Sequence, residues 1–151
     1  MLPVIFGLSG PRLTADEQSF FRDANPAGYI LFARNIEHPD QLRGLTDALR
    51  SLGGRDDVPI LIDQEGGRIA RLGPPHWRVW PAAAALAGLS DSRASTDLDR
   101  AIARVHCNYE ALGLELTAMG INVTCAPVLD VPQPDAHDII GDRAFARTPE
   151  A

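Results

Sequence analysis

The stretch with the clearest chemical potential is residues 63–71, Asp-Gln-Glu-Gly-Gly-Arg-Ile-Ala-Arg, which directly follows an apolar run. A carboxylate at the end of a buried strand is unfavourable unless it binds a ligand or accepts hydrogen bonds, so Asp63 is the first candidate for a binding role. The glycine pair at 66–67 allows a sharp turn or a close approach of the backbone to a ligand. Arg71 can direct a fork of donors toward the same place. The stretch therefore predicts a polar ligand site that contains Asp63 and Arg71.

Two other interpretations of the same stretch stay open. An ion pair between Asp63 and either Arg68 or Arg71 would fix the loop without any ligand. Alternatively, Asp63 and Glu65 are a candidate acid/base pair, because residues two apart in an extended segment share a face and lie roughly 6.5–7 Å apart. Carboxyl separations of that order occur in glycosidases. A turn at Gly66 would redirect Glu65 and remove this second interpretation.

The histidines form no recognisable site. His76 and His137 lie in expected loops that can approach the strand ends, and His106 is expected to be packed or half-exposed on a helix. No H-x-x-x-H, C-x-x-C or H-E-x-x-H spacing occurs, and the glycine-rich nucleotide-binding patterns are also missing. We therefore expect neither a metal site nor a cofactor.

The tryptophans and cysteines each allow two interpretations. Trp77 and Trp80 can form a stacking platform for a sugar, but anchoring of the long loop around them is the favoured role. Cys107 and Cys125, the only cysteines, are expected to be two buried thiols in a reducing compartment, with a single disulfide as the alternative.

Composition excludes several classes of protein. The chain has 151 residues, is 45% hydrophobic and 23% charged, and carries a net charge of −6. It is expected to be a soluble globular domain rather than a disordered, collagen-like or disulfide-stapled chain. The acidic balance argues against nucleic-acid or membrane partners. All 14 basic residues are arginine, so Schiff-base chemistry and a phosphate-loop lysine are excluded.

The apolar start at residues 1–7 is too short for a signal peptide and has no basic region before it. No run approaches the ~18–20 apolar residues that a membrane-spanning helix needs. A cytoplasmic location is expected.

Apolar runs and turn residues alternate along the chain as in successive βα units. Buried strands are expected at residues 4–8, 28–32, 58–62 and 121–126, and helices at 14–25, 39–52 and 96–119, with a long loop and short helix over 73–90. The first helix has a capping box at Thr14 and Glu17. The last has an apolar stripe from Leu98 to Met119 at alternating spacings of four and three. This order predicts an α/β protein with a parallel sheet and ligands at the carboxyl ends of its strands.

The block at residues 63–72 resembles glycoside hydrolase family 3, and is most similar to its bacterial β-N-acetylhexosaminidase branch. Further stretches match in the same order and extend the resemblance over nearly the whole chain. These stretches are residues 28–35, 122–131 and 140–145.

The resemblance implies a TIM-like (β/α)8 barrel. On this basis the chain is expected to be the N-terminal part of one barrel domain, over residues 1–151, with about the first four βα units and no internal boundary. A closed barrel typically needs ~250 residues, so the first and fourth strands would have unpaired edges and exposed apolar faces. Such edges invite a complementing C-terminal half or self-association.

The resemblance also implies an activity and a site. The parent enzyme would hydrolyse terminal, non-reducing β-linked N-acetylglucosamine with retention, in peptidoglycan turnover and recycling. Asp63 would hold hydroxyls of this sugar, and Arg71 and Arg143 would complete the polar wall. Ala144 replaces the family's usual serine, which removes one hydrogen bond.

The catalytic groups of the family are not recognisable in this sequence. The segment that carries the His–Asp dyad, similar to Lys-His-Phe-Pro-Gly-His-Gly, does not occur, and the nucleophilic aspartate should follow it. The catalytic residues are therefore expected beyond residue 151, and the chain alone is expected to be inactive. The alternative is a non-enzymatic sugar-binding or interaction module made from half a barrel. A TIM-barrel lyase or aldolase is a weaker third reading, because no lysine is present.

Overall fold

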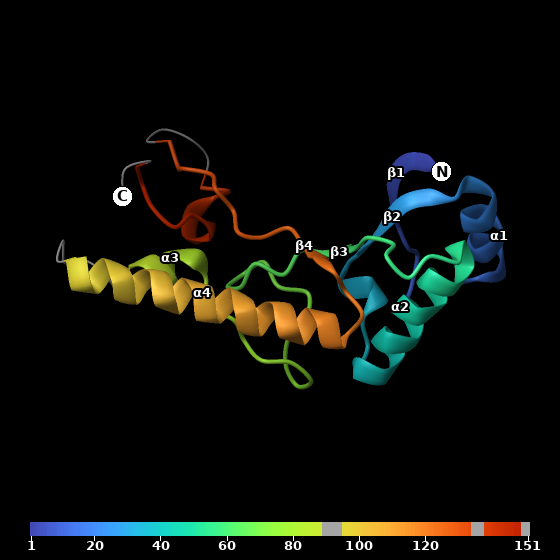
Figure 1. The fold of residues 1–151 in the computed structure, drawn as a ribbon, viewed down its shortest axis with the longest axis horizontal. Helices are drawn as coiled ribbons and strands as arrows, with labels where there is room; N and C mark the ends of the chain where they lie inside the picture. The colour runs from blue at the N-terminus through green and yellow to red at the C-terminus, as the bar shows by residue number, and fades with distance from the viewer. Residues whose placement is uncertain (89–94, 134–137, 149–151) are drawn as a thin grey trace.

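The structure is a computed structural model. It describes residues 1–88, 95–133 and 138–148. Its centre is a four-stranded parallel sheet with the strand order β1-β2-β3-β4. The strands are β1 (Leu2–Gly7), β2 (Pro26–Leu31), β3 (Ile60–Ile62) and β4 (Val123–Thr124) (Figure 1). The expected α/β class with a parallel sheet is confirmed, although β3 and β4 are shorter than the apolar runs that predicted them.

The helices follow the predicted order. They are α1 (Ala15–Ala24), α2 (Pro39–Gly53), α3 (Ala83–Ala87) and α4 (Ser95–Ala118), with 3-10 turns η1 (Ala33–Asn35) and η2 (Gly141–Arg143). The capping box is confirmed, because the Thr14 hydroxyl accepts from the Glu17 N–H and the Glu17 carboxylate accepts from the Thr14 N–H. Local sequence signals therefore fix where α1 begins.

The core lies between the sheet and the helices that cover it. Leu31, Ile60 and Ile62 are fully buried in the sheet. Buried apolar side chains of α1, α2 and the C-terminal half of α4, together with Met119 just after α4, belong to the same cluster: Phe21, Leu42, Leu45, Leu49, Leu112, Leu116 and Met119. Two polar contacts tie α2 to the end of α4, where Thr46 and Arg50 donate to the Met119 and Gly120 carbonyls.

Three predictions about burial are wrong at least in part, and the first concerns β1. The first strand was expected to be buried, but Leu2, Val4 and Ile5 are 47%, 40% and 46% exposed. The reason is topological, because β1 is an edge of the sheet and pairs only with β2. The edge exposure expected for a first strand of an open half-sheet is present.

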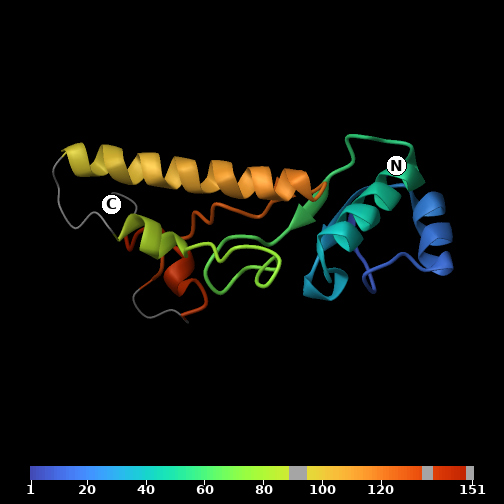
Figure 2. The ribbon, with the colours of Figure 1, turned by 90° about the horizontal axis from the view of Figure 1, so that it is seen from below.

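The apolar stripe on α4 is buried only in its C-terminal half. Leu112 and Leu116 are 1% and 4% exposed, whereas Leu98 and Ile102 are 58% and 59% exposed. Figures 1 and 2 show the reason, since the N-terminal half of α4 extends well beyond the sheet, and α3 is the helix that packs against α4 there.

The cysteine prediction is also wrong in part. Cys107 and Cys125 are both exposed rather than buried, and both are free thiols. Cys107 lies on α4, and Cys125 directly follows the edge strand β4. His106, which was expected to be packed or half-exposed, has a side chain that is 77% exposed.

Candidate functional site

Asp63 and Arg71 meet where β3 ends. Arg71 Nη2 donates to Asp63 Oδ2 at 2.9 Å, and the two side chains keep 27% and 25% of their surface exposed. One of the two ion pairs considered for Asp63 is therefore formed. Both side chains are still partly exposed to solvent. Each can form further hydrogen bonds, because a carboxylate has more than one acceptor position and a guanidinium more than one donor.

Gln64 fixes the path of the chain between Asp63 and Arg71. Its side chain is completely buried. Its Oε1 accepts from the backbone N–H groups of Arg71 and Leu72 at 2.7 and 2.9 Å, and its Nε2 donates to the Leu72 carbonyl at 3.0 Å. The loop that carries Arg71 is thus closed back onto the end of β3 by one buried amide.

The predicted turn at Gly66 is present. Gly66 has φ +99° and forms an isolated antiparallel bridge with Ile69. A Cβ atom at this position would overlap the Pro81 carbonyl oxygen, so both the backbone angle and the space require glycine.

Glu65 points to Arg143 instead of forming an acid/base pair with Asp63. Arg143 Nε and Nη2 donate to Glu65 Oε2 and Oε1, each at 2.8 Å, and the Glu65 side chain is only 8% exposed. This bidentate geometry is the strongest form of an arginine–carboxylate contact. Because both carboxylate oxygens are engaged, the structure argues against Glu65 as a group that protonates a glycosidic oxygen.

The three residues predicted to bind substrate lie in one electrostatic cluster. The hydrogen bonds that Arg143 donates to Glu65 raise the pKa of Arg143, and the charges of Glu65, Asp130 and Asp63 add to this effect. Partial burial raises the pKa of the Cys125 thiol, as do a hydrogen bond and the charge of Asp63. Asp63, Arg71 and Arg143 are thus brought together at the carboxyl ends of β3 and β4.

The sequence did not single out two other members of this cluster. Cys125 stands beside Asp63 because the β3–β4 register pairs Ile62 with Thr124, one residue earlier on each strand. Its position near the end of the strand expected at residues 121–126 was a usable signal. Tyr109 belongs to the stripe on α4, and burial together with the Glu65 charge raises its pKa. No pattern in the sequence distinguished Tyr109 from its core neighbours.

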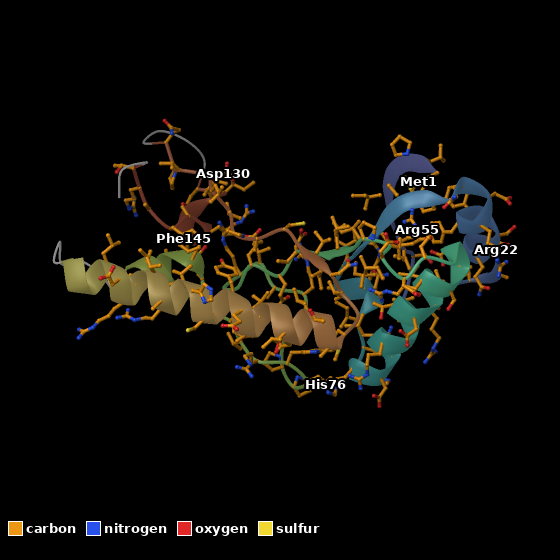
Figure 3. The ribbon with its side chains drawn as sticks, in the orientation of Figure 1. Met1, Arg22, Arg55, His76, Asp130 and Phe145 are labelled. Atoms are coloured by element: carbon orange, nitrogen blue, oxygen red, sulfur yellow. The ribbon has the colours of Figure 1, made fainter. Side chains whose placement is uncertain are left out.

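Other polar residues near the strand ends, and the histidine candidate His76, have structural roles. Arg34 Nε donates to the Leu8 carbonyl at 2.7 Å, and the buried Asn35 amide donates to the Leu8 and Gly10 carbonyls at 3.2 and 2.8 Å. These contacts connect the loops after β1 and β2. His76 packs against His38 and Trp77, and Figure 3 shows it on the other side of α4 from Asp130 and Phe145. His137 lies outside the described residues.

The tryptophans anchor the long loop, which is the role that the sequence analysis favoured over a stacking platform for a sugar. Trp80 is 5% exposed, and its Nε1 donates to Glu115 Oε1 on α4 at 3.1 Å. Arg78 covers its ring at 4.9 Å. Trp77 is partly buried and packs against the core. Since the Trp80 ring is enclosed, the stacking platform is wrong for this residue.

Within residues 1–88, 95–133 and 138–148, no group of three or more His, Cys, Asp or Glu side chains is arranged to hold a metal ion. Over the same part of the chain, no helix combines the length and hydrophobicity needed to cross a membrane.

The parallel sheet defines an α/β protein, and the paired carboxylates and arginines at the carboxyl ends of its strands form a candidate ligand site. The chain belongs to glycosyl hydrolase family 3, because residues 3–151 match the model described as the glycosyl hydrolase family 3 N terminal domain.

Relatives and solved structures agree with this family. The chain is 40% identical to a beta-hexosaminidase of Methylococcus capsulatus, over 97% of this chain and 40% of that protein. It is also 40% identical to a beta-hexosaminidase of Alkalilimnicola ehrlichii, over 99% of this chain and 41% of that protein. NagZ from Neisseria gonorrhoeae, solved in complex with N-trifluoroacetyl-D-glucosamine, aligns with a TM-score of 0.86 and 33% identity over 99% of this chain and 42% of that one. A family 3 beta-N-acetylglucosaminidase from Paenibacillus aligns with a TM-score of 0.82 and 29% identity, over 97% of this chain and 26% of that one.

Proposed function

We propose that this chain forms the sugar-binding wall of a β-N-acetylhexosaminidase that removes terminal, non-reducing β-linked N-acetylglucosamine. In this proposal Asp63 accepts hydrogen bonds from sugar hydroxyls, and Arg71 and Arg143 donate to sugar oxygens. The observation that carries it is the geometry of the cluster: two ion pairs, Asp63–Arg71 and Glu65–Arg143, lie together where β3 and β4 end, with side chains about a quarter exposed apart from Glu65.

The chemistry of the cluster suits a neutral sugar. Asp63 Oδ2 is bound by Arg71, so its charge is compensated while the carboxylate keeps acceptor capacity. Glu65 takes the Nε and Nη2 side of the Arg143 fork. Among the described residues, the Nη1 group has a single weak contact, at 3.5 Å to the Ile139 carbonyl, so it can donate to a sugar oxygen. Hydroxyl-rich ligands need alternating donors and acceptors of this kind.

The chain spans about two fifths of the curated relatives it matches, at 40% and 41% of their lengths. We propose that the four parallel strands are the first half of an eight-stranded barrel, with β1 and β4 as the edges that the remaining strands pair with. The exposure of Leu2 and Val4 on β1 and of Val123 on β4 supports this arrangement. The retaining chemistry is assigned to groups that the family carries after this region, namely the His–Asp dyad and the aspartate nucleophile.

The division of labour is tested with the 4-nitrophenyl glycoside of N-acetyl-β-D-glucosamine. The chain alone should bind N-acetylglucosamine, and a change in tryptophan fluorescence measures this binding. It should release no nitrophenol from the glycoside. Fusion of residues 1–151 to the remaining part of the Methylococcus capsulatus relative should restore turnover. Alanine at Asp63, Arg71 or Arg143 should abolish it, whereas Arg22→Ala on α1, which Figure 3 shows well away from Asp130 and Phe145, should not.

Robust turnover by the chain alone, lost in Asp63→Ala, would overturn the assignment of catalysis to groups outside it. Saturable binding without turnover in any fusion would instead favour a sugar-binding module.

A further inference from the structure

Arg143 is the one proposed sugar contact that comes from a distant part of the chain. It lies in η2, and its partner Glu65 is 78 residues earlier in the sequence. A side chain on a long loop binds a ligand well only if the loop is held in place before the ligand arrives. The question is therefore what holds residues 138–143 against the loop after β3.

A second arginine makes the opposite connection. Arg68, from the loop after β3, donates through Nε to Asp142 Oδ1 at 2.9 Å. Its Nη2 lies 3.3, 2.7 and 3.2 Å from the carbonyl oxygens of residues 138, 139 and 140. One guanidinium thus covers the successive carbonyls that lead into η2, and also pairs with a carboxylate inside it.

The two arginines cross in opposite directions between the same two loops. Arg143 reaches from the later loop to Glu65, and Arg68 reaches from the earlier loop to Asp142 and the carbonyls. Space in the crossing is fully used, because a Cβ atom at Gly141, where φ is +48°, would lie 3.3 Å from Arg68 Nη2 and 2.9 Å from Asp138 Oδ1. The backbone bonds Arg143 N–H to Ile140 O and Ala144 N–H to Gly141 O close the turn.

We propose that Glu65 and Arg68 are positioning residues for Arg143. This proposal rests on the proposed function, since it takes Arg143 as a sugar contact. Glu65 is almost enclosed and sets the rotation of the Arg143 fork, so that the Nη1 side faces the ligand. Arg68 holds the backbone of residues 138–142, so that the fork starts from a fixed point. Neither residue touches the sugar itself.

The test is a double-mutant cycle on N-acetylglucosamine binding by the full chain. Glu65→Gln keeps the shape of the side chain but loses the charge-assisted fork, and it should weaken binding by roughly five- to tenfold. Arg143→Gln should weaken it at least as much. Because Glu65 acts only through Arg143, the double variant should bind as the Arg143→Gln variant does. Glu110→Gln, an exposed glutamate on α4, is the matched control and should bind as wild type does.

Hydrogen exchange gives a readout that is independent of the sugar. Arg68→Gln, at a half-exposed position, should speed exchange of the Arg143 and Ala144 amides by about tenfold or more, and Glu65→Gln should do the same. Arg22→Gln should leave both amides unchanged.

Two results would overturn the proposal. One is that Glu65→Gln weakens sugar binding by the same factor in the wild-type chain and in the Arg143→Gln variant. The other is that the Arg143 and Ala144 amides exchange at the wild-type rate in both Arg68→Gln and Glu65→Gln. If the wild-type chain binds no sugar, the proposed function fails, and the exchange measurement still decides whether the two residues hold the loop.

Discussion

Gln64 offers the most direct test of how the structure holds its site together. Its side chain is completely buried and makes three hydrogen bonds to backbone groups of Arg71 and Leu72, at 2.7, 2.9 and 3.0 Å. Gln64→Leu has nearly the same volume and removes all three bonds. Two N–H groups and one carbonyl then lose their partners in a largely water-free environment.

The expected loss of stability follows from these three groups. Each buried polar group left without a partner costs about 1–3 kcal/mol, and the Arg71 N–H is less buried than the other two. The better burial of leucine offsets part of the total. We expect Gln64→Leu to lower the free energy of unfolding by about 3–6 kcal/mol, which is a large share of the ~5–15 kcal/mol typical of a domain.

Urea unfolding, followed by the fluorescence of the tryptophans, measures this loss. Gln133→Leu is the matched control, because Gln133 is exposed and its contact with the Val131 carbonyl is weak, at 3.4 Å. Its effect should stay within about 0.5 kcal/mol. A loss below ~1 kcal/mol for Gln64→Leu would refute the assignment of Gln64 as the residue that closes the Arg71 loop.

Three further predictions follow from other parts of the structure. Gly66→Ala combines an unfavourable φ with a clash against the Pro81 carbonyl, so it should lower the free energy of unfolding in urea by about 3 kcal/mol or more. Gly10→Ala is the control, because the space around Gly10 is open. Equal urea midpoints for the two variants would contradict this prediction. Burial opposes the charged form of Glu17, but the hydrogen bonds that it accepts from Thr14 and Ser9 outweigh this effect and lower its pKa. The stability that Glu17 contributes should therefore be fully present above its ordinary pKa and be lost as the pH falls through the lowered pKa. Glu17→Gln should flatten this part of the profile of stability against pH, and an unchanged slope would count against the prediction. Burial, followed by the hydrogen bond and the charge of Asp63, raises the pKa of the Cys125 thiol, so Asp63→Asn should increase the fraction of thiolate at pH ~8 and speed its alkylation. Mass spectrometry measures the alkylation rate, with the exposed Cys107 as the internal reference. A ratio of the two rates that stays the same in Asp63→Asn would disprove the contact between Asp63 and Cys125.

Much of the fold could be predicted because its signals are local. The capping box at Thr14 and the alternation of apolar runs with amphipathic segments gave the order of elements and the parallel sheet. Burial was less predictable. Val4 on β1 and Leu98 on α4 belong to patterns typical of a core, yet both are exposed, because an apolar pattern does not say whether another element lies opposite.

Local sequence was sufficient to locate the loop of the candidate site. Asp63, Gly66 and Arg71 sit within one loop, so their types and spacing were sufficient to predict a turn with a carboxylate and an arginine. Arg143 could be connected to that loop only through a family resemblance, because 72 residues separate it from Arg71 and no local rule reaches so far.

Only the tertiary structure decided how the charges pair. Asp63 had two arginines within eight residues, and Glu65 had a candidate role beside Asp63. Folding gives Arg71 to Asp63, Arg143 to Glu65 and Arg68 to Asp142. The physical reason is that the turn at Gly66 and the parallel register of β3 with β4 fix which guanidinium lies within hydrogen-bonding distance of which carboxylate, and that distance is set by the packing of segments far apart in the chain.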